Sequence, residues 1–319
     1  MMFLSTLSLG IVIMLSGKTW FSVWLGLEIN LLSFLPLILF SSPSGSEGGL
    51  KYFLVQATGS LLILHTSFSW VLLPCPLMFF FAPLVLKLGA APLHFWLPEV
   101  TKTLPWRINM VLLTLQKMGP LYLLAVVSAS NKLPLLVAGV FSTIIGALGG
   151  LNEMDLRKLM AFSSISHMGW MLTGAALPPA YWVLYFFTYV ITSLALMLSL
   201  DNMNIFSLNQ LTSKNKNSLL VMLLLLSLGG FPPLLGFAPK WAILAGVTSL
   251  SLPLAVLLVA TSMLTLYYYI RVGLMTLTLS SPRAGVAQTA KNNKLQTTTA
   301  VLSVGGGSLY MLMWSSLML

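Results

Sequence analysis

Four ionisable side chains lie deep in stretches of sequence that are otherwise apolar. They are Glu28 in WLGLEINLL, Lys87 in LVLKLGAAP, Lys117 in LLTLQKMGPLY and Lys240 in GFAPKWAIL. One ionised group at the centre of a membrane helix costs about 2.5–3.5 kcal/mol, so four cost on the order of 10 kcal/mol. We therefore expect these side chains to face the protein interior or a hydrated cavity. His65, His94 and His167 also stand in apolar stretches.

Buried lysine and histidine side chains are suited to carrying protons. Burial disfavours the charged form of a lysine and a nearby carboxylate favours it, so moving the partner can load or unload the amine. Histidine changes its charge near neutral pH with less tuning. The three histidines stand far apart without metal-ligand spacing, which gives no support to a zinc or haem site.

Two structural explanations of the same residues stay open. A lysine near the end of a span can extend its amine to the lipid headgroups, and this applies most to Lys240. Lys87 and Lys117 stand about ten residues from both ends of their spans, which is too deep for easy escape. A fixed ion pair that only joins helices would explain the presence of Glu28 in a membrane span just as well as a role in transport would. Three lysines cannot all be neutralised by one glutamate, which favours transport.

The composition of the chain requires a membrane. Of its 319 residues 57% are hydrophobic and 7% are charged, whereas soluble domains carry about 25% charged residues. The net charge of +10 is explained by basic loops on the inner side of a membrane, so no nucleic-acid partner is expected. The only cysteine, Cys75, excludes an internal disulfide and an iron–sulfur site built by this chain alone.

The apolar stretches predict an all-α polytopic membrane protein with about eleven transmembrane helices. A span needs roughly 20 mainly apolar residues. On that rule the spans lie at roughly 2–17, 20–40, 51–73, 76–97, 107–129, 133–151, 158–177, 180–200, 218–246, 251–272 and 297–319. No connection is long enough to be a domain, so residues 1–319 form a single membrane domain. The N-terminal stretch lacks a basic region and is expected to be the first helix rather than a signal peptide.

The distribution of basic residues predicts the orientation of these spans. The side that holds the N-terminus carries Lys51, Lys102, Arg107, Arg157, Lys158, Lys214, Lys216, Arg271, Arg283, Lys291 and Lys294. The opposite side carries only Lys18 and Lys132. Because basic loops stay on the inner side, the N-terminus is expected inside and the C-terminus outside.

Two of the expected spans are interrupted by glycine and proline and also carry a lysine. They contain APLVLKLGAAPLHFWLP and LSLGGFPPLLGFAPKWAIL, and they are the fourth and the ninth span. Paired broken spans in two halves of a transporter indicate its transport site. Because each half has five spans, the second half runs in the opposite sense, which predicts two inverted five-helix repeats, 1–130 and 131–275, and an addition at 276–319. His167 is then the ionisable counterpart of Glu28, and Arg271 that of Lys117.

Several motifs resemble one known family. WLGLEINLLSFLP, KYFLVQATGS, KLGAAPLHFWLPEV, LLTLQKMGPLYLL, LRKLMAFSSISHMGW and LGGFPPLLGFAPKWAI are similar to motifs of the antiporter-like membrane subunits of mitochondrial respiratory complex I, the NADH–ubiquinone oxidoreductase. They follow one another from residue 24 to residue 243. The termini and residues 277–296 match this family only in hydropathy.

The resemblance implies a role for each candidate residue. Glu28 is expected to be the glutamate of a Glu–Lys pair with Lys87, Lys117 the central relay lysine, and Lys240 the terminal lysine. His94 and His167 are expected as auxiliary relay residues. The family implies a proton-translocating subunit of an enzyme whose redox chemistry takes place elsewhere. NADH, FMN, iron–sulfur clusters and ubiquinone are expected on other subunits, and no cofactor or metal on this chain.

The resemblance also implies partners and a location. The partners are other membrane-arm subunits of complex I, including neighbouring antiporter-like subunits, together with membrane lipids. The location is the mitochondrial inner membrane, with the N-terminus in the matrix and the C-terminus towards the intermembrane space. Two other functions remain: a cation/proton antiporter subunit of the same fold, and a structural or quinone-contacting chain that does not pump. Lysines at the deep sites disfavour sodium, which needs oxygen ligands.

Overall fold

The computed structural model describes residues 2–42, 45–69, 76–129, 131–208, 210, 218–278 and 305–306. In these residues the chain is α-helical between its turns, apart from one isolated β-bridge between Asp155 and Ser207. The stretches that are long and apolar enough to cross a membrane are Trp20–Leu39, Trp106–Val127, Pro179–Met203 and Leu252–Met275. The expected all-helical class is therefore confirmed for the described residues.

Some sequence predictions lie outside the described residues. These are Cys75, the span at 297–319 apart from residues 305–306, and the basic residues Lys214, Lys216, Arg283, Lys291 and Lys294.

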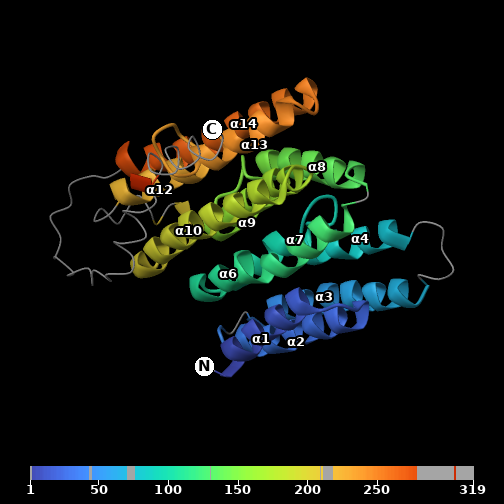
Figure 1. Cartoon of the computed structure of the whole chain (residues 1–319). Helices are drawn as coiled ribbons and strands as arrows, with labels where there is room; N and C mark the ends of the chain where they lie inside the picture. Colours follow the sequence, from blue (N-terminus) through green and yellow to red (C-terminus); the bar gives the residue numbers. More distant parts are fainter. Residues whose placement is uncertain are drawn as a thin grey trace. The chain divides into compact units, whose positions relative to one another are not determined.

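The first of two compact units covers Met1–Ser142. Its helices are α1 (Met2–Ser16), α2 (Trp20–Leu39), α3 (Gly45–Ser69), α4 (Pro76–Leu88), α5 (Trp96–Thr103), α6 (Trp106–Leu113), α7 (Leu115–Val127) and the first part of α8 (Leu133–Gly149). Helix α1 packs on α2, α2 on α3, α3 on α4 and α4 on α7, and α7 also contacts α1 (Figure 1). The helices therefore enclose a common core.

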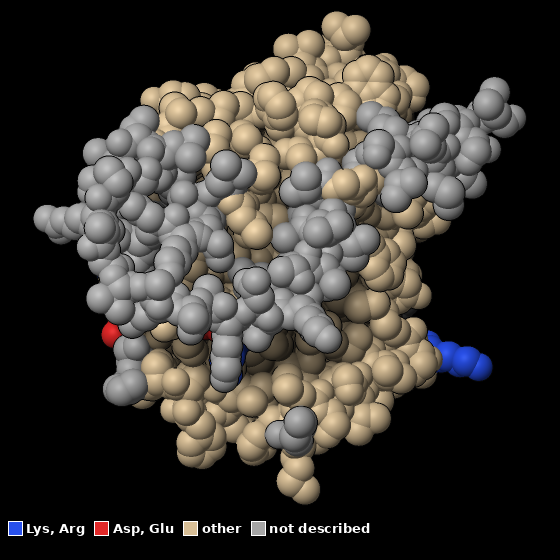
Figure 2. Space-filling model, turned by 90° about the vertical axis from the view of Figure 1, so that its left-hand side faces the viewer, with Lys and Arg blue, Asp and Glu red and all other residues tan. Residues whose placement is uncertain are grey.

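The second compact unit begins at Thr143 within α8. It contains α9 (Leu156–Ala175), α10 (Pro179–Met203), α12 (Ser218–Gly229), α13 (Phe237–Thr248) and α14 (Leu252–Thr278). Helix α10 packs on α9, α12 and α13, and α14 packs on α12 and α13. Figure 2 looks onto the ends of the helices, and the described part of that face shows few charged residues.

Both expected helix breaks are present, and each begins with the same helix-ending motif. Gly89 follows α4 with φ 70°, and Gly230 follows α12 with φ 80°. The amide of each glycine donates to the carbonyl three residues earlier, and the next amide to the carbonyl five residues before it. This is the Schellman motif, which favours glycine because the left-handed conformation crowds a Cβ. Each break then runs for seven residues, 89–95 and 230–236, before the next helix begins.

A third interruption divides the expected span at 107–129. Helix α6 ends at Leu113 and α7 begins at Leu115, with Thr114 between them at φ −117° and ψ −76°. Pro120 stands inside α7. It has no amide hydrogen to donate to the Gln116 carbonyl, which weakens the first turn of α7. Thr114 also bonds its hydroxyl to the Met110 carbonyl, a contact that bends helices.

Helix α14 extends beyond the expected span at 251–272, because it continues to Thr278. Arg271, expected near the edge of the span, therefore lies seven residues before the end of the helix.

Candidate functional site

The predicted residues fall into two clusters, one in each compact unit. The first unit holds Glu28 on α2, Lys87 in the last turn of α4, His94 in the break that follows, and Lys117 in the first turn of α7. The second unit holds His167 on α9 and Lys240 on α13. Each cluster is described separately below.

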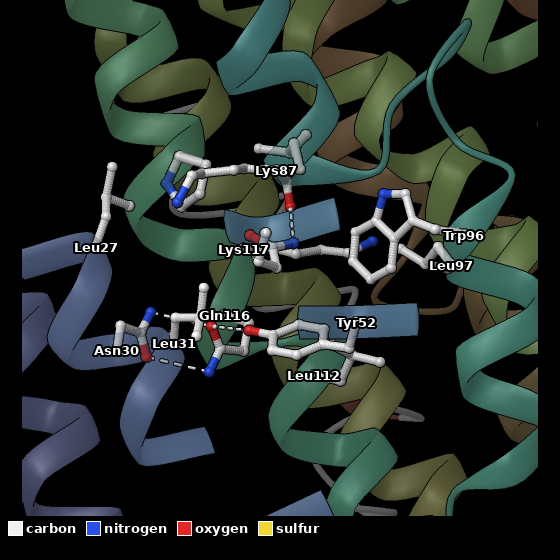
Figure 3. Close-up of a pocket in the computed structure, with 13 residues that line it drawn as sticks. Leu27, Asn30, Leu31, Tyr52, Lys87, Trp96, Leu97, Leu112, Gln116 and Lys117 are labelled. Carbon is white, nitrogen blue, oxygen red and sulfur yellow. Dashed lines mark hydrogen bonds between the residues drawn. The ribbon is translucent and has the colours of Figure 1, made fainter. Parts of the chain in front are cut away.

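Lys87 and Lys117 line one cavity inside the first unit. The space between its lining atoms measures about 390 Å³. The exposed fraction is 5% for Lys87 and 2% for Lys117, so neither lysine reaches the molecular surface. Figure 3 shows the two lysines on the same side of this cavity as the ring of Trp96. Residues 30 positions apart in sequence therefore share one internal space.

The two amines have different surroundings. The Nζ atom of Lys117 has no hydrogen-bond partner among the described residues. Lys87 interacts electrostatically with the Glu28 carboxylate. Within the described chain no salt bridge joins Glu28 to Lys87. The two residues thus make no direct ion pair among the described residues, and their functional pairing stays a prediction.

Side-chain donors satisfy the carbonyls at the end of α4. The Gln56 amide donates to the Lys87 carbonyl at 3.1 Å, and the Trp96 indole donates to the Leu86 carbonyl at 3.0 Å. A helix end leaves carbonyls without helical donors, and burying them unpaired is costly. Gln56 and Trp96 therefore stabilise the end of the helix that carries Lys87.

A network of uncharged polar groups, missed by the sequence analysis, lines the same cavity. The carboxamides of Asn30 and Gln116 donate to each other, at 3.0 and 3.1 Å. The Tyr52 hydroxyl contributes a longer bond of 3.4 Å to the Gln116 oxygen. Figure 3 shows the three side chains converging between α2, α3 and α7. The only signal in the sequence was polar residues next to Glu28 and Lys117.

His94 lies apart from these lysines. It is 5% exposed, its Nδ1 atom is 3.2 Å from the Pro92 carbonyl, and its ring lies against Phe95. It does not line the cavity of Lys87 and Lys117. His94 lies in the break, and its auxiliary role in proton transfer stays a prediction.

In the second unit Lys240 closes the end of a broken helix. Its Nζ atom donates to the Gly229 carbonyl at 2.8 Å and to the Leu228 carbonyl at 3.3 Å. It also lies 6.0 Å from the centre of the Trp170 ring. A cation at a helix C-terminus is favoured by the unpaired carbonyls and the helix dipole. Lys240 therefore bridges the break between α12 and α13 rather than extending to the surface.

His167 belongs to a buried hydroxyl-rich cluster. Its Nδ1 atom is 2.8 Å from the Tyr185 hydroxyl, and its ring packs on Tyr189. These three residues line a cavity with about 190 Å³ between its atoms, together with Ser227 of α12, Gly236 of the second break and Pro239 of α13. The second break thus has a titratable ring and several hydroxyls beside it.

An exposed ion cluster lies at the start of α3. Lys51 contacts Glu47 at 2.8 Å and Glu99 at 3.7 Å. The hydrogen bond from Lys51 and its charge hold the pKa of Glu47 below its ordinary value. The stabilisation from a lowered carboxyl pKa is present above the unfolded pKa and disappears as the pH falls through the folded one. This pair is therefore formed at neutral pH and lost in acid.

The comparisons with known proteins now decide the family. The family model described as "NADH:quinone oxidoreductase/Mrp antiporter, TM" matches residues 17–74 and 65–265. The NADH-ubiquinone oxidoreductase chain 2 of Anopheles gambiae is 36% identical over 331 residues, covering 95% of this chain and 94% of the relative. That of Salmo salar is 41% identical over 295 residues, covering 86% and 84%. The chain belongs to the NADH-ubiquinone oxidoreductase chain 2 family.

A solved structure shows the fold of this chain 2 family member. A chain of respiratory complex I from Thermus thermophilus superposes with a TM-score of 0.81 at 23% identity, covering 97% of this chain and 76% of that chain. Among the described residues, no group of three or more His, Cys, Asp or Glu could hold a metal ion. The candidate residues described above supply amines, a carboxylate, imidazoles and hydroxyls.

Proposed function

We propose that this chain is a proton-translocating subunit of the membrane arm of respiratory complex I. Protons pass along a buried series made of Glu28, Lys87, Lys117 and Lys240, with His94 and His167 as auxiliary members. The observation that carries this proposal is the cavity shared by Lys87 and Lys117. Membership in the chain 2 family supports it.

The step inside the cavity is a proton transfer between two amines. Protonated Lys87 releases a proton, which passes through the cavity to the neutral amine of Lys117, so the positive charge moves with the proton. The Glu28 carboxylate stabilises the charged form of Lys87 by Coulomb attraction. Lys117 is suited to pass its proton onward, because no described protein group holds its amine. Displacing Glu28 or changing its charge shifts the balance between the two lysines.

The energy for transport comes from electron transfer elsewhere in the complex. NADH, FMN, the iron–sulfur clusters and ubiquinone are bound by other subunits, and this chain performs no redox chemistry. Its partners are other membrane-arm subunits, including neighbouring antiporter-like subunits, and membrane lipids. The relatives' name, NADH-ubiquinone oxidoreductase, supports its membership in the oxidoreductase complex.

The chain spans the mitochondrial inner membrane as eleven helices in two inverted five-helix repeats. The first repeat covers 1–130 and the second covers 131–275, where α14 is its last span, and 276–319 is an addition in the same membrane domain. The N-terminus lies in the matrix and the C-terminus towards the intermembrane space. Apart from α5, which lies mostly between the fourth and the fifth expected span, the described helices fall on the first ten expected spans, which supports this arrangement.

Matching local geometry supports the repeat. A Cβ added to Gly10 meets the Asn30 amide and the Gly26 carbonyl, and one added to Gly146 meets the corresponding groups of Ser166 and Phe162. All three pairs are offset by 136 residues. The two breaks align as GAAPLHFWLP at 89–98 and GFPPLLGFAP at 230–239, sharing a glycine, two prolines and a leucine.

On this register the ionisable residues of the repeats do not correspond. Offset by 136 residues, the counterpart of Glu28 is Ser164 rather than His167, which lies almost one helical turn further. Offset by 141 residues, Lys87 corresponds to Leu228, whose carbonyl accepts a hydrogen bond from Lys240. Lys87 therefore lies on its broken helix, whereas the Lys240 amine reaches the end of the other broken helix from α13.

The test of this function is the proton yield of the complex. We expect Lys117→Met to lower the protons translocated per electron at least twofold in sealed inner-membrane vesicles oxidising NADH, because the transfer loses its acceptor. The matched control is Lys132→Met, the same substitution at an exposed lysine outside the helices. An unchanged yield in assembled Lys117→Met complex would refute the relay. Proton flux that depends on sodium would instead support an antiporter.

A further inference from the structure

The reciprocal bond between Asn30 and Gln116 joins the helix of Glu28 to the helix of Lys117. Asn30 lies two residues after Glu28 on α2, and Gln116 immediately precedes Lys117 on α7. Each carboxamide donates once to the other and accepts once from it. Asn30 is 4% exposed and Gln116 is partly buried, so the bond lies largely inside the unit.

The first turn of α7 needs support from outside the helix. It begins after the interruption at Thr114, and Pro120 removes the amide that would bond the Gln116 carbonyl. Side-chain bonds from Asn30 and Tyr52 reach this turn at Gln116. The direction in which Lys117 projects therefore depends on this contact.

We propose that Asn30 and Gln116 are positioning residues for proton transfer between Lys87 and Lys117. They fix the first turn of α7 so that the Lys117 amine faces the cavity that it shares with Lys87. Carboxamides do not exchange charge near neutral pH, so they act through Lys117 and are not themselves proton carriers. This inference rests on the proposed proton-translocating function.

The experiment compares apolar variants with an exchanged pair in the assembled complex. Asn30→Leu and Gln116→Met keep the side-chain size but remove the bonds, and each is expected to lower the proton yield per electron at least twofold. The double variant Asn30→Gln with Gln116→Asn retains two carboxamides of the same combined length, and it restores most of the yield. The control Asn152→Leu changes an exposed asparagine elsewhere and leaves the yield unchanged.

The double apolar variant, Asn30→Leu with Gln116→Met, separates positioning from packing. Two apolar partners of matched size leave no buried carboxamide unpaired, and only the longer bond from the Tyr52 hydroxyl is lost with them. The complex then assembles, but its proton yield stays low because the turn lacks its directional bonds. A wild-type yield in this double variant would overturn the inference, and so would a low yield in the assembled exchanged pair.

Lys117→Met in the same preparation distinguishes the two proposals. If its yield is unchanged, the proton relay itself fails. If its yield falls while Asn30→Leu and Gln116→Met retain the wild-type yield, the relay holds and the positioning inference is wrong.

Discussion

At the scale of residues, a glycine makes room for the Lys87 side chain. A Cβ at Gly59 would lie 2.9 Å from Lys87 Cγ and 3.2 Å from its Cε. The lysine therefore runs across α3 where no side chain intervenes. Lys117 differs, because its amine ends in the cavity without a hydrogen-bond partner among the described residues. Two lysines of equal burial are thus held in place by different means.

We expect Gly59→Ala to displace Lys87 and to lower the proton yield per electron about twofold or more. Alanine favours the helix by about 1 kcal/mol relative to glycine, so α3 itself is not weakened. The measurement is proton yield together with the amount of assembled complex. Thr58→Ala on the exposed face of α3 is the control. A wild-type proton yield in the assembled Gly59→Ala complex would show that Lys87 works normally beside the added methyl group.

At the scale of elements, each broken helix ends in a Schellman motif and is closed by a side-chain donor. In the first break the donors are Gln56, which lies on a neighbouring helix, and Trp96, which follows the break. In the second the donor is Lys240, which comes from the continuation of the same broken span. Each break leaves helix-end carbonyls without helical donors, and a nearby polar side chain donates to them. At the end of α12 that donor, Lys240, is ionisable.

Lys240→Met is expected to loosen the second break. It removes two hydrogen bonds to the last carbonyls of α12, and bonds from a charged donor contribute about 1.5–3 kcal/mol each. Hydrogen exchange at the Gly230 and Phe231 amides should then accelerate at least tenfold. Thr248→Ala, at an exposed position of α13, is the matched control. Unchanged exchange at both amides would mean that the Lys240 bonds do not hold the break.

At the scale of the whole molecule, basic residues indicate the orientation in the membrane. The proposed topology places Lys102 in the matrix and Lys132 on the opposite side, and both side chains are exposed. The two positions are separated by a single expected span, so their accessibility must differ if that span crosses once.

Labelling from one side tests this topology. In a Cys75→Ser background, Lys132→Cys is expected to react with an impermeant maleimide in intact mitoplasts, whereas Lys102→Cys reacts only after the membrane is opened. Detergent provides the control, because both sites should then react. Reaction of Lys102→Cys alone in intact mitoplasts would reverse the proposed orientation.

The sequence by itself determined the membrane class, the positions of the described helices, both glycine breaks and the residues able to carry charge. Hydropathy patterns and the backbone effects of glycine and proline depend on residues that are close in sequence, so the sequence alone reveals the helices and breaks that they cause. Only the tertiary structure brought Lys87 and Lys117 into one cavity, paired Asn30 with Gln116 and placed the Lys240 amine at the end of α12. These contacts depend on how helices pack and turn about their axes, which no local pattern specifies. The interruption at Thr114 was only partly predictable. Pro120 is visible in the sequence, but the break at Thr114 is seen only in the packed structure.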